Sequence, residues 1–206
     1  MDLLDVLFRA LHILFGIAWI GLLYYFNFVQ TEYFKVSEPS AKSDVVQKLV
    51  PNALWYFRYA ALFTFLTGLY LIHYLSIAIN VSIILGAVMG TLMFLNVWLI
   101  IWPNQKKVIA GAADAADAGA KAGLASRTNT LFSIPMLWFM VYSAHGSAIG
   151  NVILSVEESL TALWVGLLII LAIEANAVFG KMNAAITSVK AVIHSGIALT
   201  VILGLL

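Results

Sequence analysis

Six long apolar segments constrain the fold of this chain of 206 residues more than any other feature. They cover about residues 10–29, 57–79, 81–102, 130–148, 160–178 and 186–206. Each is close to the roughly 20 residues that an α-helix needs to cross the hydrocarbon of a bilayer. A spanning β-strand would be about half as long and would alternate apolar with polar residues. The sequence therefore predicts an all-α fold, a polytopic membrane helical bundle with about six transmembrane helices.

The composition indicates that the whole chain, and not one anchor, belongs to the membrane. Hydrophobic residues make up 63% of the chain and charged residues only 10%, whereas a soluble domain has about a quarter charged residues. The apolar excess extends along the full length, so residues 1–206 are predicted to form a single domain whose main partner is the lipid bilayer. The start, "MDLLDVLFRALHILFG", carries acids in place of a basic n-region and is expected to be a retained first span. Neither a phosphate-binding Gly-rich loop nor a basic nucleic-acid stripe is visible, so no nucleic-acid partner is expected.

The basic residues predict the orientation of the bundle. Ten of the eleven lie at alternate connections or helix ends, and only Arg9 lies on the opposite side. The ten are Lys35, Lys42, Lys48, Arg58, Lys106, Lys107, Lys121, Arg127, Lys181 and Lys190. Because cytoplasmic loops are enriched in Lys and Arg, both termini are predicted to be periplasmic. Residues 103–129, rich in alanine, are expected to form a cytoplasmic loop, either a short solvated helix or a flexible arm.

The four histidines are the residues most suited to cofactor chemistry. With no cysteine in the chain, any haem or metal must be held by histidine, methionine or carboxylate. His12, His73 and His145 all lie within about two helical turns of the outer surface in the predicted topology. His194 lies about 18 Å deep, at about 1.5 Å per residue.

Three imidazoles at one depth on three helices predict a non-covalent haem b, held by axial histidines in an aromatic-rich helical bundle. Two other interpretations stay open. Each histidine could hydrogen-bond at the headgroup level, where aromatic residues also gather. Alternatively, a lone histidine could ligate chlorophyll.

Polar residues also gather at the inner ends of the segments, where most are expected to serve topology and helix capping. They are Asn27, Glu32, Arg58, Asn104, Gln105, Arg127, Asn129, Glu174 and Asn176. Glu174 is the expected exception, because it lies inside its apolar segment. A carboxylate there could pair with Arg127 or relay protons, and Glu32 is the other acid considered for Arg127.

Four stretches of the chain resemble a known family. They are "RALHILFGIAWIGLLYYFNFVQ", "YAALFTFLTGLYL", "GTLMFLNVWLIIWPNQKKVIAG" and "SRTNTLFSIPMLWFMVYSAHG". Over about residues 8–148 the sequence resembles the membrane domain of the bacterial membrane-bound urate oxidase (urate hydroxylase) family, with "NVWLIIWPNQKK" and "SRTN-x-x-x-SIPML" as its most specific motifs. The histidine followed by "GIAWIG" is more distantly similar to haem-binding membrane protoporphyrinogen oxidases. Urate oxidases of this family add a C-terminal cytochrome c domain, but this chain has no C-x-x-C-H motif.

The resemblance favours His12 and His145 as the axial pair, because both fall on its motif positions, with His73 as the substitute. The function predicted first is a haem b protein of the bacterial inner membrane for electron transfer, an oxidoreductase or a redox subunit of one. Its donor would be a quinol or small substrate, and its acceptor a periplasmic cytochrome c or a larger membrane complex. Two alternatives stay open: an accessory or structural subunit of a larger respiratory or photosynthetic complex with incidental histidines, and a urate-oxidising enzyme that uses a separate cytochrome c.

Overall fold

The computed structural model describes residues 3–74, 79–146, 155–157 and 159–206, and helices dominate this part of the chain. Two helical runs each contain a π-helical segment, labelled η. The first joins α1 (Leu3–Tyr24), η1 (Tyr25–Gln30) and α2 (Thr31–Val36), and the second joins α5 (Val81–Leu95), η2 (Asn96–Ile101) and α6 (Trp102–Ile109). The remaining helices are α3 (Pro39–Lys48), α4 (Val50–Tyr74), α7 (Ala115–His145), α8 (Leu160–Phe179) and α9 (Val189–Gly204). The all-α prediction is therefore confirmed, and each predicted apolar segment lies largely within a helix.

Three helical runs in the described part of the chain are long and apolar enough to cross a membrane. They are Leu3–Val36, Val81–Ile109 and Leu160–Phe179, while α9 is apolar but shorter. The chain is accordingly a multi-pass membrane protein. The count of six spans and their orientation stay predictions. Helices α4 and α7 are less apolar partly because they carry buried polar side chains, among them Thr64 and Thr67 on α4 and Asn129 and Ser133 on α7.

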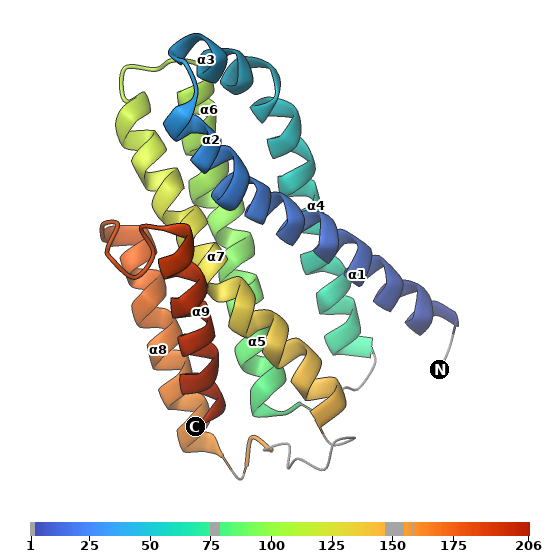
Figure 1. Ribbon diagram of the computed structural model, residues 1–206. Helices are drawn as coiled ribbons and strands as arrows, with labels where there is room; N and C mark the ends of the chain where they lie inside the picture. The colour runs from blue at the N-terminus through green and yellow to red at the C-terminus, as the bar shows by residue number, and fades with distance from the viewer. Residues whose placement is uncertain (1–2, 75–78, 147–154, 158) are drawn as a thin grey trace.

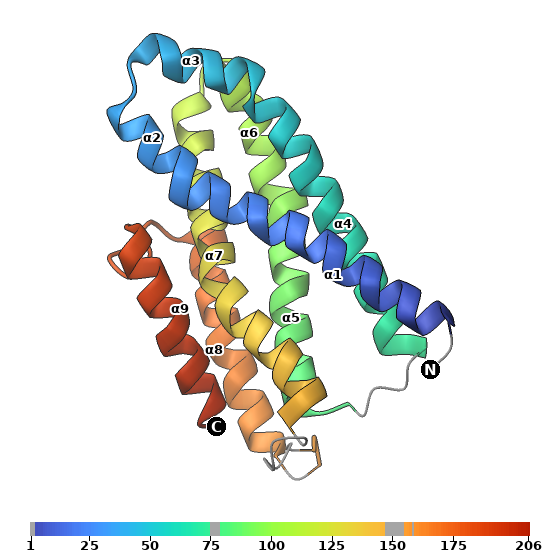
Figure 2. The same cartoon turned by 45° about the vertical axis from the view of Figure 1, so that its right-hand side comes forward.

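Helix α7 is the centre of the bundle (Figure 1). It packs against α5 and α6 along one side and against α9 and α8 along another, while α1 and α4 form a separate pair beside them. Gly86 of α5 faces α7, where an added Cβ would lie 3.5 Å from the backbone oxygen of Met136, an ordinary contact distance. Both chain ends lie toward the end of the bundle opposite α3 (Figures 1 and 2).

The alanine-rich segment 103–129 differs from the expected loop. Helix α6 continues to Ile109 and α7 begins at Ala115, so only residues 110–114 connect the two helices. Alanine has the highest helix propensity, and its small side chain lets helices pack closely. Ala118, Ala122 and Ala125 are buried, and α6 packs against α7 over this stretch. Residues 115–129 thus form the first part of the central helix, the helical one of the two expected forms, with one face packed against α6.

Candidate functional site

His12 lies on α1 at its contact with α4, where it is half-buried. Its Nδ1 is 3.0 Å from the backbone oxygen of Thr64 and 3.0 Å from Oγ1 of Thr67. Gly68 allows this approach, because a Cβ on Gly68 would lie only 3.1 Å from Cε1 of His12. Two residues of α4 therefore fix the ring of His12, and a third leaves space for it.

The hydrogen bonds identify which nitrogen of His12 carries the proton. The Thr67 hydroxyl donates to a backbone carbonyl, since it lies 2.6 Å from the oxygen of Phe63 and 3.0 Å from that of Thr64. The Thr64 oxygen can only accept, so Nδ1 of His12 must be the donor. In the neutral ring, Nε2 then carries the lone pair. A metal-ligating histidine commonly donates its other ring N–H to a backbone carbonyl, which orients the ring.

Aromatic stacks lie on either side of His12 along the α1–α4 interface. Phe8 stacks on Tyr70 with ring centres 3.6 Å apart, and Phe15 stacks on Phe63 at 5.0 Å. These pairs hold the two helices together through apolar surface. The surroundings of His12 are thus mostly apolar, and among the described residues its hydrogen-bond partners are Thr64 and Thr67.

The other histidines lie at different places in the bundle. His73 is exposed near the end of α4, so it belongs to the same helix pair as His12. His145 is the last residue of α7 and is exposed, and His194 is exposed on α9. Helix α7 meets α1 through the bond between Tyr24 and Ser133 (2.9 Å), twelve residues from each of His12 and His145. Beyond this bond α1 follows α4 away from the lower part of α7 in both views (Figures 1 and 2). The structure therefore places His12 and His73 on one helix pair and His145 at the end of another helix.

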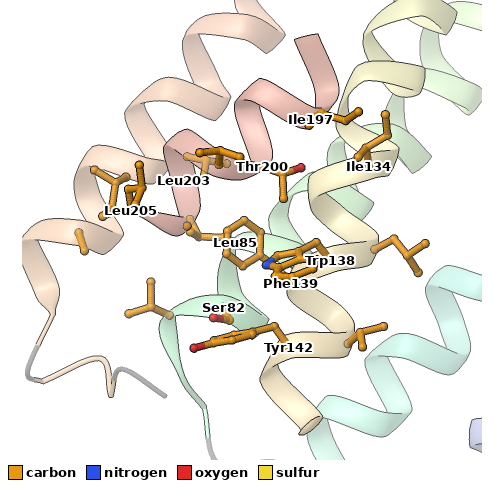
Figure 3. Close-up of a pocket in the computed structure, with 17 residues that line it drawn as sticks. Ser82, Leu85, Ile134, Trp138, Phe139, Tyr142, Ile197, Thr200, Leu203 and Leu205 are labelled. Atoms are coloured by element: carbon orange, nitrogen blue, oxygen red, sulfur yellow. The ribbon is translucent and has the colours of Figure 1, made fainter. Parts of the chain in front are cut away.

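A groove of about 1020 Å³ lies along α7 between α5 and α9. Figure 3 shows Trp138, Phe139 and Tyr142 of α7 on one side and Thr200 and Leu203 of α9 on the other. Its lining is almost entirely apolar and includes none of the four histidines. His145 follows Tyr142 by three residues on α7, which places it beside the groove's lower end on the helix surface.

A second polar region lies at the other end of the bundle, around the first half of α7. The amide of Asn96, in η2, donates to the side chains of Asn129 (2.9 Å) and Glu174 (3.1 Å). Asn129 in turn donates to the backbone oxygen of Met93 at 2.9 Å. Asn27, in η1, donates to Oγ of Ser126 at 2.8 Å. Both π-helical segments thus supply an asparagine to α7, and such segments are frequent at functional sites. We call Asn96, Asn129 and Glu174 the inner amide network.

An ion pair between Arg127 and Glu174, one option raised by the sequence, does not form. Among the described residues the salt bridges are Arg9–Asp5, Lys35–Glu32, Lys48–Asp44 and Lys107–Asp114. Glu174 instead accepts from Asn96, because α8 meets α5 and η2 at this level. Arg127 is only 5% exposed, and its Nη1 is buried without a hydrogen-bond partner in this part of the chain. Glu32 forms its salt bridge with Lys35, and its negative charge also acts on Arg127 from a longer distance.

Asn96 is the member of the network that sequence reasoning missed. It lies inside an apolar run, "MFLNVWLII", with no other polar residue nearby. A lone asparagine in such a run is costly in a membrane unless it is paired, and this could have marked it. No group of three histidine, aspartate or glutamate side chains is close enough to hold a metal ion in the residues that the structure describes.

Comparison with known families assigns the chain. The family described as urate oxidase N-terminal matches residues 78–205, which is most of the chain. The chain belongs to the urate oxidase N-terminal family. This confirms the resemblance drawn from the sequence motifs, and the two ranges overlap from residue 78 to residue 148. No cytochrome c domain is found in the chain. Searches of curated proteins and of solved structures give no match.

The family match divides the candidate residues. Arg127, Asn129, His145 and Glu174 lie within residues 78–205. His12 and His73 precede the matched range, so the assignment of His12 depends on its motif and on its hydrogen bonds.

Proposed function

We propose that this member of the urate oxidase N-terminal family is a haem b protein for electron transfer, with His12 as one axial ligand. The observation that carries the proposal is the hydrogen bond from Nδ1 of His12 to the Thr64 carbonyl (3.0 Å), which leaves Nε2 as the coordinating nitrogen. Haem b needs histidine ligands and an apolar slot without covalent attachment. Phe15 and Phe63, which stack on each other one turn from His12, supply apolar surface for such a ring.

The second axial ligand is proposed to be His145, with His73 as the substitute. His145 lies in the part of the chain that matches the family, at the free end of α7. His73 lies on α4, which packs along the helix of His12. The haem supplies one-electron chemistry when bound. The protein residues orient the imidazoles, and the aromatic side chains exclude water from the α1–α4 interface.

The proposed setting is the bacterial inner membrane with both termini periplasmic, because the basic residues gather at the opposite end. The electron donor would be a quinol or a small substrate, and the acceptor a periplasmic cytochrome c or a larger membrane complex. If the chain is part of an enzyme, family membership favours urate as the substrate and a separate cytochrome c as the electron acceptor. In that case the chain is an oxidoreductase or the membrane part of one.

An accessory or structural subunit of a larger respiratory or photosynthetic complex is the second candidate. The observation that favours it is the apolar groove on α7, where Trp138 and Leu137 are 53% and 58% exposed. A helix of a partner protein could fill a groove of this kind by close packing. In this candidate the histidines bind no cofactor. The two candidates therefore differ in whether the purified protein shows the visible absorption of a haem.

The test is the absorption spectrum of the purified protein, oxidised and reduced. We expect a haem b spectrum in the wild type, and loss of low-spin haem in His12→Ala while the protein still elutes as a folded monodisperse peak in detergent. His145→Ala and His73→Ala then identify the second ligand, because only the true ligand should convert the haem to a high-spin form. His194→Ala is the matched control, since His194 is also exposed in an apolar helix and should leave the spectrum unchanged. A colourless wild type would refute haem binding. A normal spectrum in His12→Ala would refute the assignment of His12 as an axial ligand.

A further inference from the structure

Two cationic side chains share one tryptophan ring at the end of the bundle near α3 and α6. The guanidinium carbon of Arg58, on α4, lies 3.8 Å from the centre of the Trp102 ring. Nζ of Lys106, on α6, lies 5.6 Å from the same centre. A cation gains from the electrons of an aromatic face, but two cations beside one ring also repel each other. We call Arg58, Trp102 and Lys106 the cationic pair site.

Neither cation of this site has an acidic partner in the described part of the chain, where every salt bridge involves other basic residues. Two hydrogen-bond donors nearby are also unused. Nε of Arg58 and Nε1 of Trp98 are both buried without a hydrogen-bond partner, and the guanidinium carbon lies 5.7 Å from the Trp98 ring. Buried donors without partners are rare in folded proteins. The site therefore presents the positive charges of Arg58 and Lys106 to an anion from outside the chain.

The surroundings indicate that this anion belongs to a lipid. Trp55 and Tyr56, one turn before Arg58, are 48% and 57% exposed. Exposed Trp and Tyr gather at the level of the phospholipid headgroups. Leu99, on η2 between Trp98 and Trp102, is 68% exposed and provides apolar surface for an acyl chain. A free anion would gain nothing from this apolar surface.

We propose that Arg58 and Lys106 bind the phosphate of one anionic phospholipid headgroup beside Trp102. A guanidinium binds phosphate oxygens through two parallel N–H bonds, and the ammonium adds a second charge. Basic residues between transmembrane helices at the cytoplasmic side are a known way to hold anionic headgroups. This inference is independent of the haem, because His12 lies on α1 and bonds to Thr64 and Thr67, which follow Arg58 on α4 by six and nine residues.

The test is lipid binding by the full chain in detergent, measured by native mass spectrometry with phosphatidylglycerol and phosphatidylcholine. We expect phosphatidylglycerol to bind roughly 25-fold more tightly, because each basic residue contributes about fivefold. Lys106→Gln should weaken phosphatidylglycerol binding about fivefold. Lys107→Gln is the matched control, because Lys107 is the next residue but bonds to Asp114 at 2.6 Å. It should bind as the wild type does.

Two further arms separate the alternatives. Arg58→Lys keeps the charge and should retain the preference for phosphatidylglycerol in part, while Arg58→Gln should lose about as much as Lys106→Gln. Glycerol phosphate at millimolar concentration should not displace the lipid. Equal binding of the two lipids by the wild type, or equal losses in Lys106→Gln and Lys107→Gln, would overturn the proposal. Displacement of the lipid by glycerol phosphate would show that the site binds a free phosphate and would overturn the proposal of a lipid site.

Discussion

The surroundings of His12 and the inner amide network differ in how fully their hydrogen-bonding groups are used. At His12 one ring nitrogen bonds to Thr64, and the other is left available in a mostly aromatic interface. In the inner network Asn96 donates to two acceptors and Asn129 bonds in both directions. A ligand site needs an unused donor or acceptor, whereas a satisfied network adds rigidity and fixes one packing arrangement. We therefore propose cofactor binding for the first region and helix positioning for the second.

Breaking the inner network should give the largest effect on stability. Asn129 is fully buried, and Asn129→Ala removes an acceptor from Asn96 and a donor from the Met93 carbonyl. Leaving a buried polar group without its partner costs about 1–3 kcal/mol. We expect a loss of this size in the free energy of unfolding, measured by denaturant titration in detergent. The haem spectrum of the remaining folded protein should be unchanged.

A matched control for this change is Asn104→Ala. The Asn104 amide donates only to the Ile100 carbonyl of its own helical run at 2.8 Å, so it joins no two helices. Its loss should change stability by less than about 0.5 kcal/mol, as for most partly exposed positions. Equal effects at Asn104 and Asn129 would mean that the network does not position helices.

Adding a methyl group beside His12 should change the haem spectrum moderately and leave the protein folded. In Gly68→Ala the new Cβ would lie 3.1 Å from Cε1 of His12, so the ring must move by a few tenths of an ångström. Alanine is favoured over glycine within a helix by roughly 0.5–1 kcal/mol, which offsets part of the strain. We expect a shifted haem spectrum or reduction potential with a folded protein, measured by spectroelectrochemistry.

Gly16→Ala tests whether that shift is specific. Gly16 lies one turn from His12 on α1, but a Cβ there would only reach Thr64 at 3.9 Å, an ordinary contact. It should leave the spectrum unchanged. An unchanged spectrum in Gly68→Ala as well would place the haem away from His12.

The two regions also differ in how well the sequence predicts them. Long apolar runs require helices in a membrane, so the helical segments could be predicted from local sequence alone. The candidate histidines could be named because imidazoles are rare in such runs. The bond from His12 to Thr64 depends on the register of α1 along α4, 52 residues away in sequence, which no local pattern encodes.

The inner region was predicted only in part for the same reason. Asn129 and Glu174 are visible as polar residues near segment ends, but their partner Asn96 lies 33 and 78 residues away. The π-helical segments at Tyr25–Gln30 and Asn96–Ile101 leave no periodic signal, because each is a single widened turn set by packing on α7. The helix over residues 115–129 was one of two expected forms, because alanine favours helices, but its packing against α6 could not be read from local sequence.

The smallest effect is expected between Arg127 and Glu174, and it sharpens the distinction between a hydrogen-bonded network and an ion pair. Because the two side chains form no salt bridge and Glu174 bonds to Asn96, Arg127→Lys should cost the same in the wild type and in Glu174→Gln. Mutations without a shared partner add within about 0.5 kcal/mol. A double-mutant cycle on the free energy of unfolding measures this coupling. A coupling above about 1 kcal/mol would show that the guanidinium fork contacts the carboxylate in the membrane. An ion pair, and not hydrogen bonds alone, would then position the helices of the inner region, in contrast to the uncharged surroundings of His12.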